Sequence, residues 1–168
     1  MKYDALFTPF KIGNMEVKNR FVMAPMGTNS SHIDGCIAND EIDYFEARAK
    51  GGVGLIIMGC QFLNPDLAQG SLEGILQNSY VIPQLTTVVE ATHRWGAKIC
   101  CQISCGTGRN AFPNMYGEPP FSSSDTPSTF NPEMKCRPLS EEDIKKIMTE
   151  FANSACLLYT SDAADEGL

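Results

Sequence analysis

The feature that most constrains the fold is an alternation of short apolar runs with segments of helical spacing. The three apolar runs are Phe21–Ala24, Val53–Met58 and Lys98–Ile103. The unbroken apolar run Phe21–Ala24 predicts a strand that is buried on both faces, and Val53–Met58 gives a second buried-strand signal. Lys98–Ile103 is predicted as the third strand. Because a helical segment follows each run, the sequence predicts a parallel sheet with right-handed crossovers.

The first predicted helix follows the first apolar run. Asn39 can cap it, and Asp40 and Glu41 then lie in its first turn, near the positive end of the helix dipole. Gly51 and Gly52 end it. Its predicted buried face consists of Ile42, Phe45 and Ala49.

Two more helices are predicted further along the chain. One runs from Tyr80 to Trp95, with Pro83 in its first turn and Gly96 after its end. The other begins after Ser140, which forms a capping box with Asp143. Apolar residues at helical spacing give the last helix a predicted buried face of Ile144, Ile147, Met148 and Phe151.

Two further segments complete the pattern. Ile12 and Val17 flank a Gly-Asn turn, which predicts a small β-hairpin before the first strand. The segment from Ser104 to Pro138 contains six prolines and has no helical period. Loops of this length inside a compact domain usually serve a function.

A doubly wound sheet and a (β/α)8 barrel both fit this order of elements. A dinucleotide-binding sheet would show a G-x-G-x-x-G turn after its first strand. The first run ends instead in Ala24–Gly27, and Gly106–Gly108 lacks the third glycine. The sequence therefore predicts an α/β fold of the (β/α)8 TIM-barrel class. Such a barrel needs about 250 residues, so only the N-terminal hairpin and the first three βα units are expected in these 168 residues.

Composition excludes several classes of function. The formal net charge of −7 argues against a nucleic-acid partner, which requires a basic surface. The sequence shows neither a signal peptide nor an apolar stretch of membrane-spanning length, so we expect a soluble, cytoplasmic protein without a membrane partner. Seven cysteines without a C-x-x-C spacing argue against a disulfide framework. Cys101 and Cys105 have no second cluster, so no metal site is predicted.

Three segments together resemble the NADH:flavin oxidoreductases of the Old Yellow Enzyme family. Lys18–Met26 is similar to the first barrel strand of that family, which reads K-N-R, apolar residues and then A/S-P-M. Ile42–Ile56 resembles its first helix and second strand, and Trp95–Ile103 resembles its third strand. The resemblance covers roughly residues 5 to 155, and the order of the segments makes it more specific than any one of them.

The resemblance implies that the barrel binds FMN. The implied contacts are Ala24, Pro25, Met26, Gly27, Cys60 and Gln102. They follow the carboxyl ends of the predicted strands, where barrel enzymes place their chemistry. A glutamine amide offers both a donor and an acceptor to the polar edge of the ring, and Gly27 and Gly59 allow close approach of backbone.

Each of these residues also has a purely structural interpretation. Pro25 and Met26 can end a strand and fill a core, and Gln102 can hydrogen-bond to loop backbone. Cys60 can be a small buried hydrophobic residue.

The resemblance also implies the reaction class. It implies an ene-reductase that passes hydride from NAD(P)H through FMN to an activated C=C bond of an enone or enoyl thioester. A small-molecule alkene is therefore the expected partner, and the resemblance leaves an oligomer open. The alternatives are another FMN barrel dehydrogenase, similar to the trimethylamine, dimethylamine or dihydroorotate dehydrogenases, and a non-catalytic fragment.

Within the family, Gly27-Thr28 and Gln102–Arg109 are most similar to the anaerobic branch. That branch includes 2,4-dienoyl-CoA reductase-like and bile-acid enoate reductase-like enzymes. Relatives often carry a histidine where this chain has Cys105. In that branch an iron–sulfur cluster and a nucleotide-binding domain would follow in the missing C-terminal part. The proton donor is expected beyond residue 155, so the catalytic residue is unknown.

The end of the sequence does not continue the family pattern. We expect residues 1–155 to be the N-terminal part of the FMN-binding barrel and residues 156–168 to be a non-native tail. Cys156–Glu166 resembles the translation of a transposase-type sequencing adapter, and the alternative is a natural acidic tail. Three strands leave an unpaired sheet edge, so we expect the 168-residue chain alone neither to fold stably nor to bind FMN tightly.

Overall fold

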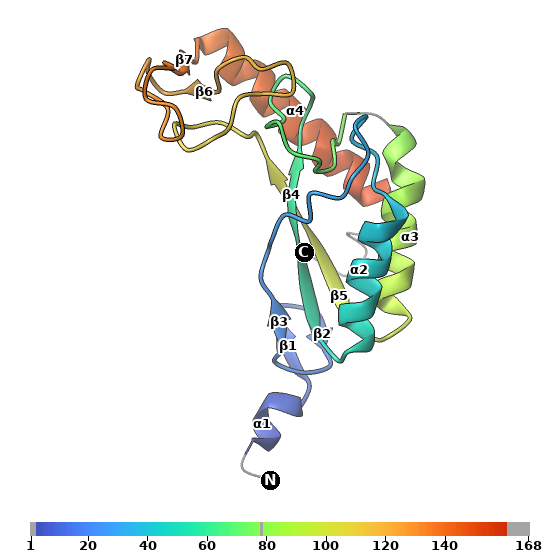
Figure 1. The fold of residues 1–168 in the computed structure, drawn as a ribbon. Coiled ribbons are helices and arrows are strands. Elements are labelled where there is room, and N and C mark those ends of the chain that lie inside the picture. Colours follow the sequence, from blue (N-terminus) through green and yellow to red (C-terminus); the bar gives the residue numbers. More distant parts are fainter. Residues whose placement is uncertain (1–2, 78, 161–168) are drawn as a thin grey trace.

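A computed structural model describes residues 3–77 and 79–160. Its centre is a parallel sheet of β3 (Val22–Met23), β4 (Leu55–Phe62) and β5 (Lys98–Ser104) in the order β3-β4-β5 (Figure 1). This arrangement confirms the predicted parallel strands. The sequence was wrong about the limits of β4, because the strand runs through Gly59 instead of ending there. A register shift between Ile57 and Cys60 marks an irregularity that the strand absorbs as it continues.

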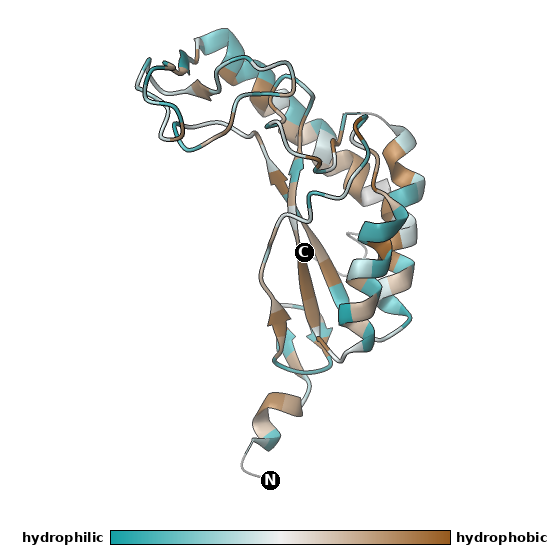
Figure 2. Ribbon diagram, viewed as in Figure 1, coloured by the Kyte–Doolittle hydropathy of each residue, from teal (hydrophilic) through white to brown (hydrophobic). Residues whose placement is uncertain are grey.

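Two helices cover one face of this sheet. They are α2 (Asn39–Lys50) and α3 (Ile82–His93), which lie side by side in Figure 1. The strands of this sheet are predominantly hydrophobic (Figure 2). The main core lies between this outer face and the helices, and its buried members include Phe45, Ala49, Ile56, Met58, Leu85, Val88, Val89 and Ile99. The burial of Phe45 and Ala49 confirms the apolar face predicted for α2.

The helix ends agree with the sequence in part. The N-cap of α2 is Ala38, with no side-chain cap hydrogen bond, so the prediction that Asn39 caps this helix was wrong. Gly51 and Gly52 end α2 as predicted, with Gly52 in the left-handed region at φ +104°. A 3-10 turn, η1 (Ser79–Val81), precedes α3, and Pro83 lies in the first turn, where its missing N–H costs little.

The chain begins with an element that the sequence did not predict and one that it did. The short helix α1 (Asp4–Phe7) precedes the hairpin of β1 (Phe10–Ile12) and β2 (Met15–Val17), which pair antiparallel. Met15 and Val17 of the hairpin are buried and form a second core cluster with Leu55 at the start of β4. The hairpin therefore packs against the amino-terminal ends of the strands.

The inner face of the sheet, opposite the helices, is open. Val22 is 46% exposed, and residues 24–27 after β3 are also exposed. The prediction that the first strand is buried on both faces was therefore wrong for this chain. The physical reason is that α2 and α3 cover the outer face only, whereas in a closed barrel the inner face is packed against the remaining strands.

Helix α4 (Glu141–Thr160) begins at the predicted capping box. The Asp143 carboxylate accepts from the backbone N–H of Ser140 at 2.9 Å, and the Asp143 N–H donates to Ser140 Oγ at 3.1 Å. Its predicted buried face was wrong: Ile144 and Met148 are exposed, and Ile147 and Phe151 are half-buried. The first half of α4 lies beside the long loop and the short parallel pair β6 (Phe121–Ser122) and β7 (Arg137–Pro138), beyond the sheet (Figure 1).

The second half of α4 contacts α3 and β5, where Ser154 is buried. The helix continues through Cys156 to Thr160, and Leu158 packs against the main core. Residues 161–168, which make up the rest of the predicted tail, lie outside the described residues. No described helix is long and apolar enough to span a membrane.

Candidate functional site

Cys60 and Gln102 lie next to each other on the inner face of the sheet. They are register partners on β4 and β5, and Cys60 Sγ donates to Gln102 Oε1 at 3.4 Å. Cys101, the residue before Gln102, packs into the core under the helices. Because successive side chains of a strand point to opposite faces, Gln102 projects from the open face.

The loop after β3 reaches the same place through two glycines. A Cβ on Gly59 would lie 2.6 Å from Met26 O and 2.8 Å from Gly27 Cα. Only glycine allows the backbone of residues 26–27 to cross β4 at this point. Gly27, Cys60 and Gln102 therefore form one line across the carboxyl ends of the three strands.

The remaining candidate residues directly precede Gly27 in the chain. Ala24, Pro25 and Met26 follow β3 directly and are exposed, Met26 to 57%. The structural interpretation of Met26 as a core residue is therefore wrong for this chain. Within the described residues, the hydrogen bond to Gln102 Oε1 comes from Cys60, and Gln102 makes none to loop backbone. The structure thus brings Met26 and Gly27 against β4 at Gly59, next to Cys60 and its partner Gln102, and Ala24 and Pro25 precede them in the same exposed segment.

The chemistry of this surface fits a flavin ring. None of the six residues has an acidic or basic side chain, and Gln102 is exposed, with an amide that carries a donor and an acceptor. A flat ring with a polar edge needs such an amide at the edge and uncharged packing on its faces. No group of three or more His, Cys, Asp or Glu side chains in residues 3–77 and 79–160 is placed to hold a metal ion.

The cysteines near the site are free thiols. Burial raises the pKa of Cys101 to about 12, and the nearby charge of Glu41 adds to this shift. Burial also raises the pKa of Cys100. Since the thiolate is the nucleophilic form, neither residue is a candidate nucleophile at neutral pH.

Sequence reasoning missed two buried carboxyl groups behind the loop that follows β3. Ser31 Oγ donates to Glu41 Oε2 at 2.7 Å, and the Asn29 N–H donates to Glu73 Oε1 at 2.9 Å. Burial raises the pKa of both carboxyl groups. The sequence placed Glu41 in a first turn, where an acid is ordinarily solvated, and no pattern marked Glu73.

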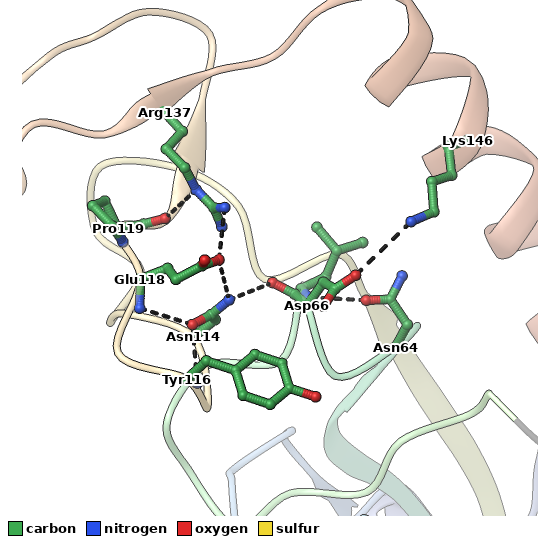
Figure 3. A network of polar contacts seen from close by, with 9 residues as sticks. Asn64, Asp66, Asn114, Tyr116, Glu118, Pro119, Arg137 and Lys146 are labelled. Atoms are coloured by element: carbon green, nitrogen blue, oxygen red, sulfur yellow. Dashed lines mark hydrogen bonds and ion pairs between the residues drawn. The ribbon is translucent and has the colours of Figure 1, made fainter.

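A second polar cluster lies away from the candidate residues, where the long loop meets α4 (Figure 3). Arg137 Nη1 donates to Glu118 Oε2 at 2.8 Å, Arg137 Nε donates to the Pro119 carbonyl at 2.7 Å, and the guanidinium lies over the Phe121 ring. Lys146 of α4 lies 3.9 Å from Asp66. A cavity of about 210 Å³ is lined by residues that include Asp66, Glu118, Phe121, Arg137 and Lys146 and none of the six candidates. The contacts of Arg137 therefore lie within the long loop, and Lys146 joins α4 to the segment that follows β4.

Comparison with known proteins gives a match over nearly the whole chain. A family model described as the NADH:flavin oxidoreductase / NADH oxidase family matches residues 5–163. The cinnamate reductase of Clostridium sporogenes is 34% identical over 159 residues, which are 92% of this chain and 24% of the relative. The chain therefore spans about a quarter of the length of that curated relative.

Solved structures give the same architecture. Old Yellow Enzyme from Pichia sp. AKU4542 superposes with a TM-score of 0.82 at 23% identity, over 94% of this chain and 43% of that chain. Histamine dehydrogenase from Rhizobium sp. 4-9 superposes with a TM-score of 0.79 at 28% identity, over 96% of this chain and 23% of that chain. The first three βα units of a TIM barrel account for the described fold, as the sequence predicted.

Proposed function

Because the chain belongs to the NADH:flavin oxidoreductase / NADH oxidase family, we propose that it is the N-terminal part of an FMN-dependent ene-reductase. Residues 1–155 would form the start of the FMN-binding barrel, and the rest of the barrel would follow in a longer protein. Two observations support this proposal: the chain contains three of the eight units of a barrel, and it spans 24% of its curated relative.

The observation that carries the proposal is the line of Gly27, Cys60 and Gln102 on the open face. When bound there, FMN would supply hydride transfer from NAD(P)H to the β-carbon of an activated alkene. Gln102 would hold the polar edge of the ring through its amide, with Cys60 beside it to orient that amide. The backbone of residues 24–27 would form the adjoining border of the site. A proton must reach the α-carbon, and we place its donor beyond residue 155.

The proposal predicts a specific role for Gln102. In the longer protein, Gln102→Ala should weaken FMN binding about tenfold or more, because it removes two hydrogen bonds to the ring edge. Fluorescence quenching of FMN on titration measures this change. Gln84→Ala, on α3 behind the sheet, is the matched control and should bind like the wild type. Equal affinity of the Gln102 and Gln84 variants would contradict the assignment.

A second candidate function is oxidation of an amine. The likeness to histamine dehydrogenase favours it, since that protein is 28% identical over this chain. The two reactions differ in which compound reduces the flavin. An amine substrate would reduce the oxidised flavin directly and so bleach its absorbance under anaerobic conditions. In an ene-reductase NADH would reduce the flavin, and an enone or cinnamate-like acid would reoxidise it. Alkene-dependent NADH oxidation without amine-dependent bleaching supports the ene-reductase, and the reverse result supports the amine dehydrogenase.

A further inference from the structure

Two buried carboxyl groups lie behind the loop that borders the proposed flavin site, and the chemistry above does not use them. Glu41 is 1% exposed and Glu73 is 7% exposed. Among the described residues neither forms an ion pair with a lysine, arginine or histidine. Burial of a carboxyl group without such a partner costs free energy unless hydrogen bonds replace the lost water. The hydrogen-bond partners of Glu41 and Glu73 therefore indicate the structural role of the two carboxyl groups.

The Glu73 carboxylate holds a strained part of the loop. Its Oε1 accepts from the Asn29 N–H at 2.9 Å. Asn29 has φ +51°, the left-handed region that non-glycine residues rarely adopt. Its side chain Oδ1 accepts from the Leu72 N–H at 2.7 Å, so both the backbone and the side chain of Asn29 bond to residues 72–73.

Glu73 also shapes the path of Gly27. A Cβ on Gly27 would collide with Glu73 Oε1, so the loop backbone passes directly against the carboxylate. On its other side, Gly27 crosses Gly59 of β4. The backbone at Gly27 is thus confined between the Glu73 side chain and the strand that carries Cys60.

The segment that carries Glu73 is itself fixed to the sheet. The Phe62 N–H donates to Gly74 O at 2.8 Å, and the Leu76 N–H donates to Phe62 O at 2.7 Å. The Ile75 N–H donates to Gly35 O at 3.0 Å. Because Phe62 is the last residue of β4, the position of Glu73 is set by the same strand that carries Cys60.

Glu41 completes the contact from the helix side. Its Oε2 accepts from Ser31 Oγ at 2.7 Å, and the Ser31 N–H donates to Leu72 O at 2.9 Å. Burial raises the pKa of Glu41, and the charge of Glu73 raises it further. Burial also raises the pKa of Glu73, while the backbone N–H groups of Asn29 and Thr28 act in the opposite direction by favouring its charged form.

We propose that Glu73 is a positioning residue for the flavin site: its carboxylate, supported by Glu41, fixes the backbone of Gly27–Asn29 against β4 and so sets the border of the site. The proposal rests on the proposed function only for the identity of the ligand, because the contacts of Glu73 with the loop are properties of the chain itself.

The test compares Glu73→Ala with Glu73→Gln in the longer protein. Glu73→Ala should raise the amide hydrogen exchange of residues 24–31 about tenfold, because it removes a hydrogen bond to a charged group. It should also weaken FMN binding about tenfold and shift the visible absorption of the bound flavin. Glu73→Gln keeps an acceptor oxygen for the Asn29 N–H and should restore most of both properties.

Asn64→Ala is the control for a merely structural effect. Asn64 is buried and its Oδ1 accepts from the Leu67 N–H at 2.9 Å, away from the loop. This variant should lower Tm but leave the exchange of residues 24–31 and the flavin spectrum unchanged. The proposal is overturned if Glu73→Ala leaves that exchange at the wild-type rate, or if Asn64→Ala raises it equally. If the wild type binds no FMN, the proposed function fails, and the exchange data still decide the role of Glu73.

Discussion

At the scale of single residues, Glu41 gives a pH dependence with a definite sign. Burial raises its pKa in the folded state, so the folded chain binds this proton more tightly than the unfolded chain does. The stability that this group contributes is full below the unfolded pKa of about 4.3 and is lost as pH rises through the raised folded pKa. The groups that face it are Ser31, Glu73, Thr28 and Cys101, none of them cationic.

Glu41→Gln should therefore flatten the dependence of stability on pH above about pH 4.5. At pH 8 we expect the variant to equal or exceed the wild type by about 1 kcal/mol, since glutamine still accepts from Ser31 and carries no buried charge. Thermal unfolding of the longer protein from pH 5 to 8 measures the effect. Glu90→Gln, on the exposed side of α3, should follow the wild-type profile. A Glu41→Gln profile that also follows it would contradict the assigned cause.

The candidate site shows which residue-scale features sequence can predict. Gln102 and Gly27 could be found because a strand end and a family pattern both mark them. The sequence could not show why residue 27 has no room for a side chain, because the neighbour that fills this space is Glu73, which lies 46 positions further along the chain. Contacts between loops depend on how the strands are registered, and no local pattern records that register.

At the scale of elements, the helices differ in how well their sequence predicts their burial. In α2 and α3 the apolar stripe faces the sheet, because each helix returns along the strand that it follows. In α4 the same spacing put Ile144 and Met148 on a predicted buried face, yet both are exposed, Met148 to 67%. The period of a helix identifies a face, but the neighbouring element decides whether that face is covered.

The start of α4 gives a prediction at the same scale. Ser140→Ala should raise the amide exchange of residues 141–145 about fivefold, because it removes the acceptor for the Asp143 N–H. Hydrogen exchange with mass spectrometry measures the change. Glu142→Ala is the matched control, since Glu142 is exposed in the same turn, and it should leave the exchange close to wild type. Fraying in both variants, or in neither, would show that the capping box does not stabilise this turn.

At the scale of the whole molecule, the open inner face leads to a prediction about the chain by itself. Among the described residues no further strand adds to the sheet beyond β3 or β5, and Val22 and Met26 lie exposed on the inner face or beside it. We expect the 168-residue chain alone to unfold without a sharp transition and to bind FMN more weakly than the longer protein. Calorimetry and an FMN titration of both proteins test this. A sharp, cooperative transition of the chain alone would contradict it.

The hairpin at the start of the chain gives the molecule a direction. Met15 and Val17 pack on Leu55, so the hairpin covers the amino-terminal end of the strands. The opposite, carboxyl end of the strands is open, and Gly27, Cys60 and Gln102 lie there. Along the strand axis the inner face is therefore closed at the amino-terminal end and open at the carboxyl end, so a ligand reaches it from the carboxyl end.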